Sequence, residues 1–182
     1  RKVKNALKVL SEGGIILYPT DTIWGIGCDA TNDKAVKRVY ELKKRAKSKA
    51  LIILIAEYAH MYKLLDQVSP NAYEYMHKSK PTTVIFDNIK NISRNILATD
   101  GSAAVRLVKD RFCVNLILKL GHPLVSTSAN ISGGENPKKF SDINMELIDN
   151  VDYIVNLRRE EIMDTPSSII KLYSNGKINK IR

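Results

Sequence analysis

The sequence predicts an α/β fold built on an open sheet of mixed strand direction, with helices on its faces. Short apolar segments typical of buried strands alternate with segments in which apolar residues recur every three or four positions, as they do in helices. The alternation lacks a strict strand–helix–strand rhythm, which favours a mixture of parallel and antiparallel pairs. The segment ALIILIA, residues 50–56, is apolar throughout and predicts a strand buried on both faces.

The composition agrees with one globular domain. The 182 residues suit a single domain, which we expect to span residues 1–182, and 44% of them are hydrophobic, enough to form a core. No apolar run approaches the roughly 18 residues of a membrane span, and the first residues, RKVK, lead into a mixed-charge segment rather than a signal peptide. Cys28 and Cys113 lie far apart and lack the spacing of a disulfide framework or a zinc site. We therefore expect a cytoplasmic protein that binds no membrane.

Each helix is predicted from apolar residues at helical spacing, and each strand from a short apolar run. The first helix ends at Gly13 and Gly14, and Thr31, Asn32 or Asp33 caps the second. The predicted helices cover residues 3–10, 35–42, 57–66, 69–78, 111–120 and 140–149. The predicted strands cover residues 15–18, 23–28, 50–56, 82–86, 103–107 and 123–129, followed by DYIVN, SSIIKL and KINKIR near the C-terminus.

The charge points to anionic partners. Lysine and arginine number 29 against 19 aspartate and glutamate residues, a formal net charge of +10. Such an excess favours nucleotides, nucleic acids or acidic membranes, although a lysine-rich organism would produce it as well. Only three histidines are present, which leaves little imidazole for acid–base chemistry.

Polar residues directly follow the first predicted strand in YPTDTIWGIG. Thr20, Asp21 and Thr22 lie where open α/β sheets place ligands, although they could also cap or turn the chain. Gly25 and Gly27 belong to a G-x-G-x-x-A pattern, but residues 19–24 separate it from the strand, and no acidic residue ends a strand about 20 positions later. We interpret these glycines as positions where the backbone bends and passes closely, rather than as a dinucleotide-binding turn.

Five cations lie within seven residues directly before the most apolar strand: Lys43, Lys44, Arg45, Lys47 and Lys49. A run of charges usually forms a solvated helix face, but this run must lie at an edge or mouth of the sheet. If the preceding helix ends before it, Lys43, Arg45 and Lys49 can converge on one anion, because they share a side of an extended chain. Arginine can then bind a phosphate or carboxylate through two hydrogen bonds.

Hydroxyl groups fill the strand predicted within PLVSTSANISGG. With the two-residue period of a strand, Ser126, Ser128 and Asn130 share one face while Thr127 takes the other. Ser128 and Asn130 would then present a hydroxyl and an amide together at the end of the strand. A polar strand with local side-chain bonds is the alternative.

The turn after this strand, Ser132-Gly133-Gly134, is expected to offer free backbone N–H groups to an anion. A serine nucleophile is disfavoured, because the sequence has no G-x-S-x-G motif and His122 has no obvious orienting carboxylate. Arg106 lies inside the apolar segment AAVRL, so its charge must be paired or face a ligand. Ser167 lies at the entrance to a later strand, and Arg182 ends the sequence.

Taken together, several segments resemble one family. YPTDTIWGIGCDA, ELKKRAKSKALIILIA, AAVRL, PLVSTSANISG and PSSII occur in the order and approximate spacing of the TsaC/YrdC family, the threonylcarbamoyl-AMP synthases. The resemblance extends over essentially the whole sequence and is to the short, single-domain members. It implies a YrdC-like twisted open mixed sheet flanked by helices, with a basic concave cleft. The sequence departs from the family pattern at Ala46 and at Ser79-Lys80-Pro81, where the family usually has Pro and Pro-Gly-Pro.

The resemblance also implies a nucleotidyltransferase. The family forms threonylcarbamoyl-AMP and pyrophosphate from L-threonine, bicarbonate and ATP with Mg2+, for the t6A37 modification of tRNA by downstream t6A transferase proteins. By this resemblance, the residues that bind threonine or its carbamate are Thr20, Thr22, Arg106, Ser128 and Ser167. Lys43 and Arg45 are the catalytic residues, and the ATP side comprises Lys43, Arg45, Lys49, Ser102, Asn130 and Arg182, with no metal ligand assigned.

Two alternatives remain at this stage. A double-stranded RNA- or tRNA-binding module on the same scaffold would lack adenylating activity, and the related YciO-like branch has no well-established role. A nicotinamide-dependent enzyme would use the turn at Gly25 and Gly27. The synthase branch is favoured because the sequence retains Lys43, Arg45, Ser128 and Asn130.

Overall fold

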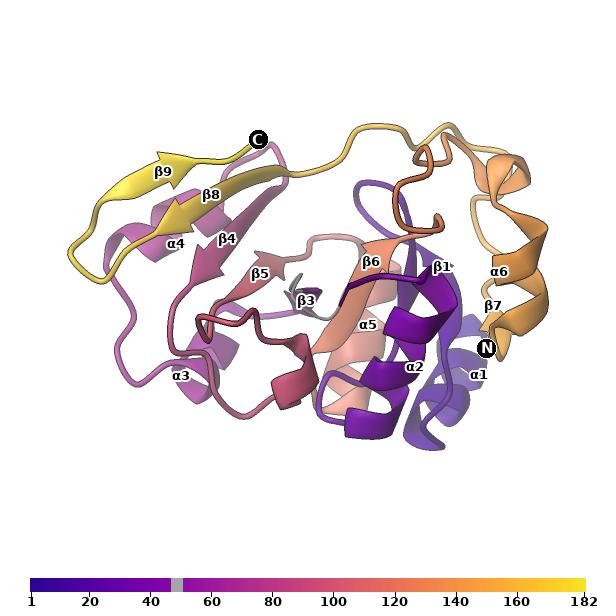
Figure 1. Cartoon of the computed structure of the whole chain (residues 1–182), viewed down its shortest axis with the longest axis horizontal. Helices are drawn as coiled ribbons and strands as arrows, with labels where there is room; N and C mark the ends of the chain where they lie inside the picture. Colours follow the sequence, from indigo (N-terminus) through magenta and orange to yellow (C-terminus); the bar gives the residue numbers. More distant parts are fainter. Residues whose placement is uncertain (47–50) are drawn as a thin grey trace.

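The structure is a computed structural model that describes residues 1–46 and 51–182, so the predicted site residue Lys49 lies outside the described residues. Within them the strands form one twisted sheet in the order β7-β1-β2-β6-β3-β5-β4-β8-β9 (Figure 1). The strands are β1 (Ile16–Pro19), β2 (Trp24–Gly27), β3 (Ile52–Ile55), β4 (Thr82–Phe86), β5 (Ala103–Leu107), β6 (Leu124–Ser128), β7 (Tyr153–Ile154), β8 (Ser168–Leu172) and β9 (Ile178–Lys180). The helices are α1 (Lys2–Ser11), α2 (Asp33–Lys43), α3 (Met61–Leu64), α4 (Asn71–Met76), α5 (Arg111–Leu120) and α6 (Met145–Asn150), with 3-10 turns η1 (Tyr58–His60), η2 (Arg94–Ile96) and η3 (Phe140–Asp142).

The strand directions are mixed, as predicted. Three pairs are parallel: β1 with β7, β3 with β5 and β4 with β8. The other neighbours run antiparallel, including the β1–β2 hairpin that contains the YPTDTIWGIG segment. The predicted α/β class with an open mixed sheet is therefore confirmed.

Local signals explain the helices that were predicted closely. The Asn32 side chain accepts a hydrogen bond from the Ala35 backbone N–H and begins α2. Asp110 begins α5 in the same way by accepting from the Cys113 N–H, and Gly121, at φ 78°, ends it in the left-handed conformation. The helix predicted at residues 111–120 is confirmed.

Three other predicted helices are shorter or broken. The segment at residues 57–66 contains only η1 and α3, because Leu65 turns to extended backbone, and the segment at 69–78 contains only α4. The segment at 140–149 is divided where extended Ile143 ends η3 and Asn144 caps α6 through the Glu146 N–H. Apolar spacing continues through each break, so it could not mark the ends. No helix within the described residues combines the length and apolarity needed to cross a membrane.

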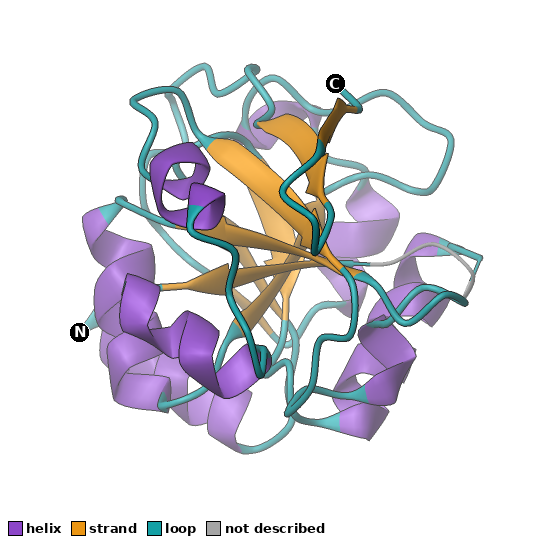
Figure 2. Cartoon of the chain, turned by 90° about the vertical axis from the view of Figure 1, so that its left-hand side faces the viewer, coloured by secondary structure: helices purple, strands orange, loops and turns teal. Residues whose placement is uncertain are grey.

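Helices cover both faces of the sheet (Figure 2). On one face, α1 and α5 pack against β1, β3 and β6 through Leu10, Leu116 and Tyr18. On the other, α2, α3, α4 and α6 cover the larger core cluster, which includes Val39 and Leu147. Because successive side chains of a strand point to opposite faces of the sheet, neighbouring residues of one strand pack into opposite helical layers.

The α1/α5 layer covers only part of its face. Register pairs Leu54 of β3 with Arg106 of β5, and Arg106 with Thr83 of β4, so these residues lie side by side across the sheet. Leu54 packs under the α5 layer, whereas Arg106 lines an open cleft beyond it. The cleft therefore lies over the part of this face formed by the end of β6 and by β3, β5, β4 and β8.

Candidate functional site

The cleft has a volume of about 400 Å³ and brings together segments from the whole length of the sequence. Of the predicted site residues, those that line it are Thr22, Arg45, Ser102, Arg106, Ser128, Ser167 and Arg182. Its described lining contains three arginines and six hydroxyl side chains, and no carboxylate, lysine or histidine. The cleft is therefore suited to anionic ligands that accept many hydrogen bonds.

The β1–β2 turn forms one wall. The Thr20 hydroxyl donates to the Ile23 carbonyl at 2.7 Å, accepts from the Thr22 N–H at 3.1 Å and lies 3.1 Å from the Thr22 hydroxyl. Thr20 is buried beneath the wall, while Thr22 lines the cleft. Thr20 thus holds Thr22 in place and does not itself line the cleft.

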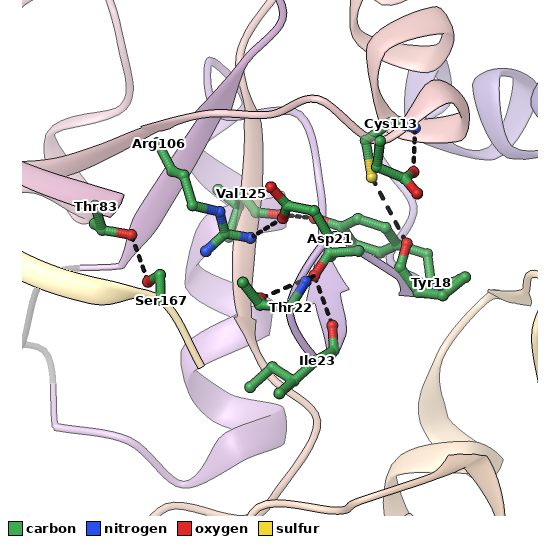
Figure 3. A network of polar contacts seen from close by, with 12 residues as sticks. Tyr18, Asp21, Thr22, Ile23, Thr83, Arg106, Cys113, Val125 and Ser167 are labelled. Atoms are coloured by element: carbon green, nitrogen blue, oxygen red, sulfur yellow. Dashed lines mark hydrogen bonds and ion pairs between the residues drawn. The ribbon is translucent and has the colours of Figure 1, made fainter. Parts of the chain in front are cut away.

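Arg106 is both paired and placed on the cleft. Its Nη2 lies 3.0 Å from the Asp21 carboxylate, which points toward the guanidinium group (Figure 3). Arg106 is only 3% exposed, and such a buried charge requires a partner. Its Nε forms no hydrogen bond with any described residue, so a donor remains available on the same group. Asp21 is therefore a positioning group for the arginine.

The C-terminal segment forms the opposite wall. The Ser167 hydroxyl lies 2.7 Å from the Thr83 hydroxyl, as Figure 3 shows. Arg182 donates from Nε and Nη2 to the Ser167 carbonyl at 3.0 and 2.8 Å, which ties the last residue of the sequence to β8. Burial, and then the charge of Arg106, lowers the pKa of Arg182, consistent with two guanidinium groups that share one cleft.

Lys43 lies beneath the cleft rather than in it. Its side chain is buried, and Nζ donates to the Thr127 hydroxyl at 2.9 Å, the Ser128 carbonyl at 2.6 Å and hydroxyl at 3.1 Å, and the Asn130 amide oxygen at 3.0 Å. Burial, and then the charge of Arg45, lowers the pKa of Lys43 to about 7. Lys43 organises the end of β6, and Ser128 and Asn130 are brought together at 2.5 Å as the sequence predicted.

Two expectations for this region are wrong. Lys43 and Arg45 do not share one side of an extended chain, because α2 continues through Lys43 and the left-handed Lys44 ends it. The expected separation of Thr127 from Ser128 also fails, because the Lys43 Nζ lies at the end of β6, where it donates to both hydroxyls.

The turn at Ser132-Gly133-Gly134 is formed, but it is not an open anion site. The Ser132 N–H donates to the Lys43 carbonyl at 2.8 Å, and the Gly134 N–H donates to the Ile131 carbonyl at 2.8 Å. Asn130 donates its amide N–H to the Gly134 carbonyl at 2.7 Å. The backbone of this turn is used to hold Asn130 and the end of α2.

Gly25 and Gly27 lie within β2, where they pair with β1, and not at a strand-to-helix turn. A Cβ at Gly27 would lie 2.2 Å from the Val125 carbonyl oxygen and 2.7 Å from the Tyr18 ring. The close backbone passage predicted for these residues is confirmed, the predicted bend is absent, and a dinucleotide-binding turn is excluded at this position.

Comparison with known proteins identifies the family. The Sua5/YciO/YrdC family model, which carries the description "Telomere recombination", matches residues 8–182. The chain belongs to this family. It is 34% identical over 134 residues to the threonylcarbamoyl-AMP synthase of Saccharophagus degradans, covering 72% of this chain and 70% of that protein. It is 31% identical over 181 residues to the protein of the same name from Blochmanniella pennsylvanica, covering 97% and 91%.

Solved structures of the Sua5/YciO/YrdC family share the fold. P. abyssi Sua5 complexed with L-threonine superposes with a TM-score of 0.82 at 26% identity, covering 93% of this chain and 50% of that one. The H234A/Y235A form of P. abyssi Sua5 gives a TM-score of 0.85, also at 26% identity, over 94% and 53%. The chain therefore spans about half the length of these Sua5 chains. E. coli YciO, 21% identical with a TM-score of 0.84 over 100% and 89%, shares the fold.

Some residues that line the cleft were not predicted as site residues. Ser126, Thr127 and Asn136 add polar groups, and Ile52, Ile85 and Ile169, among others, add apolar surface. Ser126 and Thr127 belong to the hydroxyl-rich strand, so their residue types were a signal. Asn136 follows the glycine turn in an irregular segment, where no periodicity indicates a direction.

His122 corrects a further expectation, because Asp29 provides the orienting carboxylate at 2.8 Å from its Nδ1. The pair lies outside the cleft lining, so it supplies no base to the serines there. Among the described residues, no group of three or more His, Cys, Asp and Glu side chains is arranged to hold a metal ion.

Proposed function

We propose that the protein is an L-threonylcarbamoyladenylate synthase, which converts L-threonine, bicarbonate and ATP into threonylcarbamoyl-AMP, pyrophosphate and water. The observation that carries this proposal is the meeting of Arg45, Arg106 and Arg182, from distant parts of the sequence, in one cleft without a described carboxylate in its lining. The names of the curated relatives and the P. abyssi Sua5 complex with L-threonine support the same activity.

The chemistry explains why arginine and hydroxyl groups suffice. The threonine amine attacks the carbon of bicarbonate or of CO2 derived from it, and water is lost as the carbamate forms. A carbamate oxygen then attacks the α-phosphorus of ATP, and the bond to the pyrophosphate oxygen breaks. Two anions must therefore approach one another, so fixed positive charge and hydrogen-bond donors lower the barrier without a covalent enzyme intermediate.

We assign the threonine side to the β1–β2 turn and the neighbouring strands. Thr22 contacts the amino acid and is held by Thr20, while Arg106, Ser128 and Ser167 bind its carboxylate or carbamate. The support is geometric: Asp21 fixes Arg106 at 3.0 Å, and Thr83 fixes Ser167 at 2.7 Å. These contacts are made within the protein itself, and side chains held in this way need little ordering on binding.

We assign the ATP side to Arg45, Ser102, Asn130 and Arg182, with Lys49 as a further candidate. ATP would enter as its Mg2+ complex, with the ion held by phosphate oxygens and water, because the described lining offers it no carboxylate. Lys43 lies beneath the cleft and donates hydrogen bonds to Ser128 and Asn130, so it is a positioning residue in this proposal.

A pyrophosphate-release assay tests the proposal. We expect release that requires ATP, L-threonine and bicarbonate together, with the reaction lacking threonine as the essential control. Release that is independent of threonine would contradict the assigned reaction. RNA affinity without any turnover would favour the RNA-binding module instead. In the proposed role the product passes to the t6A transferase proteins that modify tRNA.

A further inference from the structure

A second cavity, of about 420 Å³, lies at the other end of the central strands. It is bounded by α3, by the loop at Lys90 and Asn91, and by the turn between α5 and β6. Both α3 and the start of β6 lie along the lower edge of the sheet in Figure 1. β6 begins beside this cavity and ends at Ser128 in the cleft, so about 13 Å of strand separates them. The two cavities have no described lining residue in common.

The wall of the second cavity is rich in groups that can carry positive charge. These are His60, Lys63, Lys90 and His122, and the described lining contains no carboxylate. Carboxylates lie behind three of them: Glu57 is 3.9 Å from His60, Asp66 pairs with Lys90, and Asp29 faces His122. Lys63 is exposed and forms no ion pair with a described residue. The cavity surface is therefore suited to an anion, with Lys63 as its uncompensated charge.

His122 is held in a fixed orientation. Its Nδ1 lies 2.8 Å from one oxygen of the buried Asp29 carboxylate. The other oxygen accepts from the Thr31 backbone N–H at 2.8 Å and hydroxyl at 2.7 Å. Because Nδ1 faces the Asp29 carboxylate, Nε2 is the ring nitrogen left for a ligand, and in the imidazolium form it donates to an anion. The imidazole remains about half exposed, with a side-chain exposure of 49%.

An aromatic ring lines the same cavity. Tyr62 is 65% exposed, although a tyrosine ring usually buries most of its apolar surface. It packs edge-on against Tyr58 with the ring centroids 6.2 Å apart, which supports it from behind. A flat ligand group can therefore lie against Tyr62 while its anionic end reaches Lys63 and His122.

We propose that this cavity is a second ligand site, which binds a free mononucleotide. The phosphate contacts Lys63, Lys90 and His122, and the base lies against Tyr62. The volume is within the range of about 300–1,000 Å³ typical of small-molecule sites. The site is separate from the cleft and does not depend on the reaction proposed for it.

Amide chemical shifts of the full chain during titration with AMP test the proposal, because they report on each cavity separately. We expect saturable shifts at Lys63, Asn91, Gly121 and His122. Lys63→Ala should weaken this binding at least fivefold, since it removes the uncompensated charge from an exposed position where folding is not at risk. His122→Gln provides a second variant that keeps a polar side chain beside Asp29.

Matched controls separate this site from the cleft and from general charge. Lys177→Ala removes the same charge from the exposed β8–β9 turn and should leave the titration unchanged. Arg45→Ala, in the cleft, should leave the four amide shifts intact even if AMP no longer perturbs Ser128. The outcome for this second ligand site is therefore independent of the outcome for the proposed synthase activity.

Related ligands test each contact. Adenosine and inorganic phosphate should each bind at least tenfold more weakly than AMP. The site is overturned if AMP shifts none of the four amides, or if the Lys63→Ala and Lys177→Ala titrations coincide. Inorganic phosphate that binds as tightly as AMP would refute the contact with Tyr62. Tighter binding of the trinucleotide pApApA than of AMP would refute a free mononucleotide as the occupant.

Discussion

The threonine side and the ATP side of the proposed site differ in how firmly the protein holds them. The threonine side is built on strands and a tight hairpin turn, and its central charge, Arg106, is neutralised by Asp21. The ATP side takes Arg45 from the residues after α2 and Arg182 from the end of the sequence. We therefore expect stability and activity to be coupled on the threonine side and separable on the ATP side.

The largest effect is expected at Arg106. Arg106→Met leaves the Asp21 carboxylate without its partner, and breaking such a buried pair typically costs about 3–5 kcal/mol. We expect a loss of that size in the free energy of unfolding, measured by urea denaturation, together with loss of detectable pyrophosphate release. The double variant Asp21→Asn/Arg106→Met should recover part of the stability and none of the activity. A single variant as stable as the wild type would show that the pair has no structural role.

Arg45→Ala should reduce the activity without reducing the stability of the fold. We expect pyrophosphate release to fall by about 100-fold, which corresponds to about 2.7 kcal/mol of transition-state stabilisation. Cooperative unfolding should be retained, because Arg45 lies outside the strands that form the core. Turnover at the wild-type rate would remove Arg45 from the site.

The lowered pKa of Lys43 predicts that the free energy of unfolding depends on pH. Its pKa is lowered to about 7 in the folded protein, so between pH 7 and its ordinary value near 10.5 the unfolded chain binds more protons than the folded one. Stability from this group therefore rises with pH across that window, by up to about 1.4 kcal/mol per pH unit. Urea denaturation at pH 7, 8 and 9 should show this slope in the wild type and a smaller slope in Lys43→Met. Identical slopes would contradict the lowered pKa.

A smaller effect is expected at Arg158, which contacts the β1–β2 turn from outside the cleft. Its Nη1 donates to the Thr20 carbonyl at 3.3 Å, and its Nη2 lies 2.6 Å from Asp110 at the start of α5. Arg158→Ala should raise KM for threonine about threefold and reduce stability by about 1 kcal/mol, with little change in kcat or in KM for ATP. Arg159→Ala, at the neighbouring position, is the control. An equal change in both KM values would show that Arg158 does not act through the turn.

The sequence predicted the parts of the fold that depend on local pattern. β3 was located closely because burial on both faces gives a continuous apolar run in the sequence. α5 was located closely because its Asp110 cap and its terminal Gly121 are both recognisable from residue type. The breaks at Leu65 and Ile143 were not located, because the apolar spacing of the sequence continues through both of them.

The site was predictable where hydroxyl or charged residues interrupt apolar strands, as at Arg106 and Ser128. The burial of Lys43 was not predictable, since it depends on oxygens of Thr127, Ser128 and Asn130, more than 80 positions away. Asn136 was missed because an irregular segment has no period from which to infer direction.

The missing side chain at position 27 has a consequence for the geometry of the cleft. With only hydrogen at Gly27, the Val125 carbonyl oxygen and the Tyr18 ring both pack directly against the backbone of β2. The turn that contains Thr22 lies directly before β2, and Ser128 of β6 pairs with Gly25, so the same two strands carry both of these cleft residues. A single methyl group at position 27 would therefore have to displace β6 or Tyr18, and it would shift the strands on which Thr22 and Ser128 depend.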